Sequence, residues 1–100
     1  MNASTDAVTV YIGIGNSDNK LTQQEWANFC ADVVACLRDV ASQFLGEWYS
    51  LPHEQWQNAE YAAVVPADRM AYMRSILAAY RERYRQDSIA LAVVSETEFI

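Results

Sequence analysis

The chain opens on a strict alternation of apolar and polar positions. Every second residue from Val8 to Ile14 is a β-branched aliphatic, and Tyr11 lies on the opposite side of the alternation. A period of two is typical of a strand with one buried face. We therefore expect a first strand over residues 8–14, ended by the turn-forming run 15–20.

The period then changes to that of a helix. Thr22 and Glu25 have the spacing of a capping box, in which each side chain binds the other residue's backbone N–H. Apolar residues recur three and four positions apart from Trp26 to Ala41, with polar residues between them. This pattern predicts an amphipathic helix over residues 22–41.

Two strands and a second helix account for the middle of the chain. Residues 44–51 are rich in aromatics and residues 56–65 read as the returning strand, with a hairpin connection at 52–55. Pro66 suits the first turn of a helix. An apolar stripe follows on that helix at Met70, Met73, Leu77, Tyr80 and Tyr84, widened by Tyr72 and Ile76.

A last strand is expected over residues 88–94, and residues 95–100 either prolong it or hang free. The element order is then strand, helix, strand, strand, helix, strand. Right-handed crossovers would place both helices on one face of a four-stranded antiparallel sheet, which is a ferredoxin-like α+β sandwich. We expect a single domain over residues 8–100 after a disordered N-terminus at 1–7. The open face of the sheet is where function or assembly should be sought.

Composition excludes several classes of protein. The 100 residues carry 13 Asp and Glu against 7 Lys and Arg, a net charge of −6, which disfavours nucleic-acid binding because phosphate contacts need basic side chains. Cys30 and Cys36 are too few for a disulfide scaffold and lack metal-ligand spacing. We find neither a signal sequence nor a membrane-spanning stretch, so we expect a cytoplasmic protein. Without metal-ligand spacing of Cys or His, we expect no metal, and we expect no cofactor.

Several motifs resemble a known family. Tyr11-Ile12-Gly13, Leu21-Thr22 leading to Glu25-Trp26 and Phe29, Gly46-Glu47-Trp48, and Ala79-Tyr80-Arg81 leading to Gln86-Asp87-Ser88 are similar to a bacterial family of small domains of unknown function. The chain, including its ending Thr97-Glu98-Phe99-Ile100, also resembles small uncharacterised proteins of actinobacterial phages. The resemblance implies the same fold and a phage origin, and it implies no activity.

The candidate binding residues are aromatic side chains and one loop. Tyr11, Trp48, Tyr49, Trp56 and Tyr61 could stack a ligand or anchor a partner, and alternation allows only one of Trp48 and Tyr49 to face outward. Asn16, Ser17 and Asp18 follow Gly13 and Gly15 before a helix, either as a structural turn or as a ligand loop.

Charged residues give weaker indications. Five arginines between positions 69 and 85, with Glu82 as the only acid there, give that segment a net charge of +4 and leave −10 elsewhere. The last three, Arg81, Arg83 and Arg85, either stabilise the helix C-terminus or bind a small acidic ligand or an acidic patch of a partner, for which Arg85 is our candidate. Glu47 and Glu60 would form an acid–base pair if they shared the open face. His53 lies in a loop with no nucleophile paired to it.

Three functional hypotheses follow. The first is a non-enzymatic, phage-encoded module that engages a host protein through its surface or open sheet, as a homodimer. The second is a protein that sequesters a small nucleotide-like anion with Arg85, the loop at 16–18 and a stacking aromatic. The third is an enzyme of the dimeric α+β-barrel type with Glu47 or Glu60 as the base, which rests on fold analogy alone.

Overall fold

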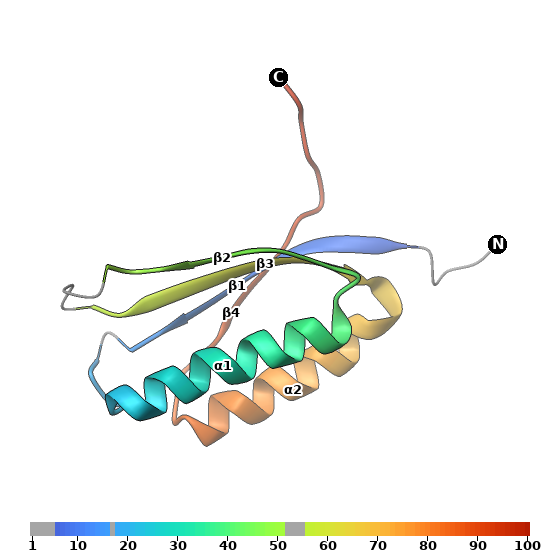
Figure 1. Ribbon diagram of the computed structural model, residues 1–100. Helices are drawn as coiled ribbons and strands as arrows, with labels where there is room; N and C mark the ends of the chain where they lie inside the picture. The colour runs from blue at the N-terminus through green and yellow to red at the C-terminus, as the bar shows by residue number, and fades with distance from the viewer. Residues whose placement is uncertain (1–5, 17, 52–55) are drawn as a thin grey trace.

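Two layers make up the molecule, a four-stranded sheet and a pair of helices (Figure 1). The computed structural model describes residues 6–16, 18–51 and 56–100. In chain order the elements are β1 (Ala7–Gly15), α1 (Gln23–Val40), β2 (Gln43–Tyr49), β3 (Asn58–Pro66), a short 3₁₀ helix η2 (Ala67–Arg69), α2 (Met70–Arg83) and β4 (Ala90–Val93). The expected ferredoxin-like βαββαβ arrangement is confirmed.

The strands lie in the order β2-β3-β1-β4, and each neighbouring pair is antiparallel. β1 therefore lies at the centre with β3, and β2 and β4 form the edges. Both helices cover one face of the sheet, and no described element covers the other (Figure 1). β1 begins at Ala7, one residue before the expected start, while the expected hairpin connection at 52–55 lies outside the described residues.

The core forms between the helices and one side of β1 and β3. Register places Ile12 opposite Tyr61 and Val10 opposite Ala63, and all four side chains are fully buried. The apolar stripes of the two helices pack against this side, because removal of apolar surface from water is the main stabilising term in folding. The principal helical members of the core are Phe29, Val33, Leu37, Met73, Leu77 and Tyr84.

The start of α1 is as its sequence predicts. Thr22 is the N-cap, its hydroxyl accepts the Glu25 N–H at 3.1 Å, and the Glu25 carboxylate accepts the Thr22 N–H at 3.0 Å. This backbone hydrogen bond, together with the Arg85 guanidinium, lowers the pKa of Glu25. The capping box is confirmed.

The second helix departs from expectation in two ways. Pro66 ends β3, and residues 67–69 form the 3₁₀ helix before α2 begins at Met70. The prediction that Tyr72 widens the buried stripe is wrong: Tyr72 is 51% exposed, and the Arg69 guanidinium lies 5.6 Å from its ring. A cation over an exposed ring favours this position at the surface.

Candidate functional site

The open face of the sheet brings together side chains from three strands. Trp48 of β2 lies directly opposite Glu60 of β3, and Glu60 lies opposite Gly13 of β1. One pair further along, Ala62 lies opposite both Tyr11 and Gly46. Because neighbouring strands keep side chains in register, these residues form one surface on the side away from the helices.

Trp48 is positioned by the absence of a side chain at Gly46. A Cβ built on Gly46 would lie 3.2 Å from the end of the Trp48 indole, so the ring lies back over the glycine. Ala62 is only 2% exposed although it faces the uncovered side, which we attribute to Tyr11 and Trp48 on the flanking strands. Trp48 itself remains 56% exposed and Tyr11 38%.

A shallow hollow of about 320 Å³ lies between Tyr11, Trp48 and Glu60. Exposed rings attract cations through their negative faces, and a carboxylate beside them adds a full negative charge. This combination is suited to an ammonium or guanidinium group and unsuited to an anion.

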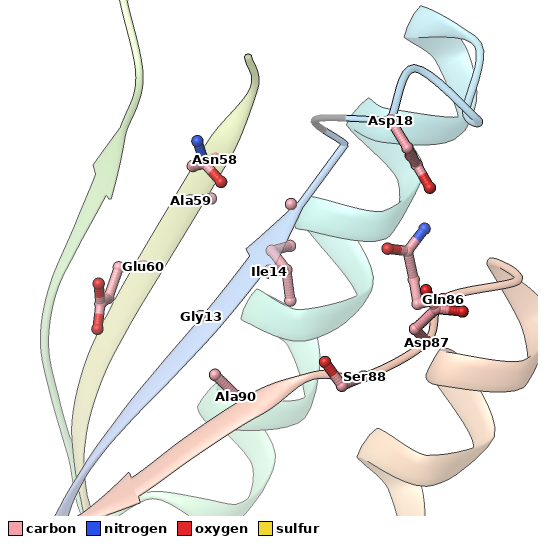
Figure 2. Close-up of a pocket in the computed structure, with 11 residues that line it drawn as sticks. Gly13, Ile14, Asp18, Asn58, Ala59, Glu60, Gln86, Asp87, Ser88 and Ala90 are labelled. Atoms are coloured by element: carbon pink, nitrogen blue, oxygen red, sulfur yellow. The ribbon is translucent and has the colours of Figure 1, made fainter.

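A larger hollow of about 580 Å³ adjoins the same face and shares Glu60 with the first (Figure 2). Asp18 and Gln86 point toward one another at one side of it, and Glu60 lies on β3 at the other side (Figure 2). Asp87 is the third carboxylate among the lining residues, which include no Lys or Arg. Across the described residues no group of three or more His, Cys, Asp or Glu is arranged to hold a metal ion.

The loop that was a candidate ligand site is held by its own contacts. Asn16 is 2% exposed, and its amide nitrogen donates to the Leu21 carbonyl at 3.1 Å and to the Gln57 side chain at 2.9 Å. Its amide oxygen accepts the Leu21 N–H at 2.9 Å. Asp18 is exposed and pairs with Lys20 at 3.5 Å, while Ser17 lies outside the described residues.

Arg85 ends α2 and binds back to α1. Its φ of 55° is left-handed, its N–H donates to the Glu82 carbonyl and the Gln86 N–H donates to the Arg81 carbonyl, which is the Schellman pattern. The guanidinium lies 3.0 Å from the Glu25 carboxylate. Among the described residues that line the larger hollow, Arg85 is absent.

The other candidate aromatics divide between the two faces. Tyr61 is fully buried among the helices, and its hydroxyl donates to the Tyr49 hydroxyl at 3.3 Å. Tyr49 is therefore on the helix side and Trp48 on the open side, the division that alternation required. Trp56 is 60% exposed just before β3 and does not line the hollow that Tyr11 and Trp48 share.

Glu47 and Glu60 do not form the hypothesised acid–base pair. Glu47 pairs in register with Tyr61 and lines a hollow beside α1, whereas Glu60 lies on the open face. The sheet separates them, because adjacent residues of a strand point to opposite faces. The second possible general base, His53, lies outside the described residues.

Two features of the site could not be found by sequence reasoning. Asp87 and Gln86 line the larger hollow beside Gly13 only because β4 pairs with β1, and nothing near them in the chain signals that pairing. The role of Gly46 under the Trp48 indole depends on a side-chain conformation.

Within the described parts of the chain, neither helix has the length and apolarity that a bilayer crossing requires.

Comparison with known proteins supports the fold. No family model and no curated protein matches this sequence. Among solved structures, a DUF3240 family protein from Shewanella baltica OS155 superposes with a TM-score of 0.55 at 13% identity, covering 100% of this chain and 99% of that one.

Two further structures are similar in architecture. An unknown protein from Galdieria sulphuraria matches with a TM-score of 0.54 at 10% identity over 93% of this chain, which spans 50% of that protein's length. A dimeric ferredoxin-like protein from an uncultured marine organism matches with a TM-score of 0.41 at 10% identity, covering 99% and 96% of the two chains. At 13% and 10% identity, the likeness to the Shewanella and Galdieria proteins establishes the fold alone.

Proposed function

We propose that this protein is a non-catalytic interaction module that binds a basic patch of a partner protein through the open face of its sheet. One observation carries the proposal: the Glu60 carboxylate lies between two exposed aromatic side chains, Tyr11 and Trp48, on a face that no described element covers. Exposed aromatics on such a face are typical of protein–protein contacts, where Trp and Tyr supply much of the binding energy.

Charge selects the type of partner. Glu60 also borders the larger hollow with Asp87 and with Asp18, which is paired with Lys20. Glu60 and Asp87 make this surface acidic, as is the whole molecule with its net charge of −6. A Lys or Arg side chain of the partner would lie against the rings and pair with Glu60. The same charge disfavours the hypothesised nucleotide-like anion.

The open face is a poor surface for self-association. Docking two copies through it would bring the Glu60 carboxylate of each copy into one seam, and like charges across an interface are destabilising. We keep the homodimer as part of the proposal but place its contact at another surface. The resemblance to phage proteins makes a bacterial host protein in the cytoplasm the expected partner.

The proposal is tested by recovering partners from host-cell extract with four forms of the protein. Wild type, Trp48→Ala and Glu60→Gln are compared with Tyr72→Ala, the matched control, because Tyr72 is an aromatic of similar exposure on the helix side. We expect one host protein to be retained by wild type and by the control, and to be lost from the other two forms.

Binding of a defined probe checks the chemistry separately. Titration of labelled protein with an arginine-rich peptide should shift the Trp48 indole N–H resonance, and an equally long glutamate peptide should not. Glu60→Gln should lower the affinity for the arginine-rich peptide about tenfold, because a desolvated contact of a cation with an aromatic ring and a carboxylate contributes on the order of 1–2 kcal/mol. Equal loss of the host protein from Tyr72→Ala, or equal shifts with both peptides, would refute the proposed surface.

A further inference from the structure

A second surface with its own chemistry lies at the edge of the sheet. Arg74, Leu77 and Arg81 of α2 face Ile89 and Leu91 across a groove of about 200 Å³. Leu77 is buried and the two aliphatic residues on the β4 side are half-buried. The groove therefore has an apolar floor with a guanidinium at either end of its helical wall.

These two arginines are the uncompensated cations of α2. Arg83 pairs with Asp32 at 3.2 Å, and Arg69, just before the helix, lies 3.7 Å from Asp39. Among the described residues neither Arg74 nor Arg81 has a salt-bridge partner. On a molecule of net charge −6, this is a local basic site that no acidic side chain of residues 6–16, 18–51 and 56–100 pairs with.

The segment after β4 has the complementary chemistry. The Val94 N–H donates to the Thr9 carbonyl, and beyond it residues 95–100 belong to no strand. Phe99 is 93% exposed and Ile100 has no contact that shields it. The segment carries two carboxylates, at positions 96 and 98, and it projects from the side of the sheet opposite the helices (Figure 1).

We propose that residues 95–100 of a second copy of this chain dock in the groove between Arg74 and Arg81. Two helical turns separate the arginine Cα atoms by about 10.5 Å, while Glu96 and Glu98 lie on one side of an extended chain about 6.7 Å apart. Long, flexible arginine side chains span the difference, so both ion pairs can form together. Thr97 then lies over the apolar floor, and Phe99 and Ile100 continue beyond one of the arginines.

The position of β4 permits this exchange to be reciprocal. β4 is an edge strand of four residues, and among the described strands it pairs only with β1. A two-fold axis relates the two contacts, so each copy inserts its own segment and receives the partner's. This dimer leaves the open face free for a partner.

Charge reversal tests the proposal with the full chain. Two double variants, Arg74→Glu/Arg81→Glu and Glu96→Arg/Glu98→Arg, are examined by sedimentation velocity over a wide range of concentration. Each alone should dimerise on the order of a hundredfold more weakly than wild type, because a reciprocal dimer loses four attractive pairs and gains four repulsive ones.

An equimolar mixture of the two variants is the decisive sample. The unchanged tail of one meets the unchanged groove of the other, and the reversed tail meets the reversed groove, so the mixture should dimerise nearly as tightly as wild type. Circular dichroism confirms folding of each variant. Glu96→Arg/Glu98→Arg, which alters only exposed side chains, carries the test by itself if the groove variant does not fold.

Three results would overturn the inference. They are a wild-type protein that is monomeric at every concentration, a variant that dimerises as wild type does, and a mixture that stays monomeric. A dimer that is dissociated by Trp48→Ala would place the contact on the open face and would also overturn it. None of these results depends on whether the basic partner exists, so the two proposals fail independently.

Discussion

Asn16→Ala distinguishes a structural loop from a ligand loop at the end of β1. Asn16 follows the last residue of the strand and its amide makes three hydrogen bonds, two to the backbone of Leu21 and one to the side chain of Gln57. Gln57 is bonded in turn to Gln23 at the start of α1, at 2.8 Å. The substitution therefore removes the side-chain hydrogen bonds that join the end of β1 to the segments just before α1 and β3, and leaves the backbone hydrogen bond from Asn16 to Gln57 in place.

The expected cost follows from burial. Asn16 is 2% exposed, as is Leu21, so water cannot readily replace the lost partners. A buried hydrogen bond contributes about 1 kcal/mol net, and an orphaned buried group costs at least as much. The loss of three such bonds should lower the free energy of unfolding by about 3 kcal/mol. For a domain of this size that lowers Tm by about 10–20 °C.

Urea denaturation followed by far-UV circular dichroism measures this change. The matched control is Asn28→Ala, because Asn28 accepts a single exposed hydrogen bond, from Gln24 at 3.0 Å on the surface of α1. Its loss should change stability by less than about 0.5 kcal/mol, offset by the higher helix propensity of alanine. An Asn16→Ala protein as stable as the control would refute the structural role and return the loop to the ligand hypothesis.

Three further predictions concern α2 and the thiols. Arg85→Gly should be more stable than Arg85→Ala by about 1 kcal/mol in the same urea assay. Both variants lose the ion pair with Glu25, but only glycine adopts the φ of 55° without strain. Equal stabilities of the two variants would contradict the assigned helix cap. Burial, followed by the hydrogen bond to Asp32, raises the pKa of Tyr84 to about 12. The unfolded chain therefore loses this proton first, and stability should fall as pH rises from about 10 to about 12, a dependence that Tyr84→Phe should reduce. Burial also raises the pKa of the Cys36 thiol to about 11. A thiol reagent near neutral pH should therefore modify Cys36 only at the rate at which the protein unfolds. Immediate reaction of Cys36 in the native protein would contradict its burial.

The elements themselves are readable from local pattern. The period of two at residues 8–14, the capping box at Thr22 and Glu25, and the stripe that includes Met73 and Leu77 each reflect which side chains must leave water on a strand or helix of that period. Boundaries shifted by one or two residues where ends are set by turns. Tyr72 was misplaced because an apolar ring at the rim of a stripe can pack inward or lie under a cation, and the sequence does not distinguish the two.

The candidate site depended on pairing between distant segments. That Tyr11 faces away from the helices follows from alternation, but its neighbours Trp48 and Glu60 come from two other strands, whose register no local signal specifies. A shift of one residue would have placed Glu47 on that face instead. The amide of Asn16 was likewise satisfied by Gln57, which lies 41 residues further along the chain.

By itself, then, the sequence determined the order of the elements, the buried side of each and hence the ferredoxin-like class, because those depend on the spacing of apolar residues within one helix or strand. The tertiary structure alone decided which side chains meet. It brought Glu60 between Tyr11 and Trp48, and it set Arg74 and Arg81 beside the edge of β4. Those juxtapositions arise from strand register and helix docking, which are selected by packing over the whole core rather than by any one segment.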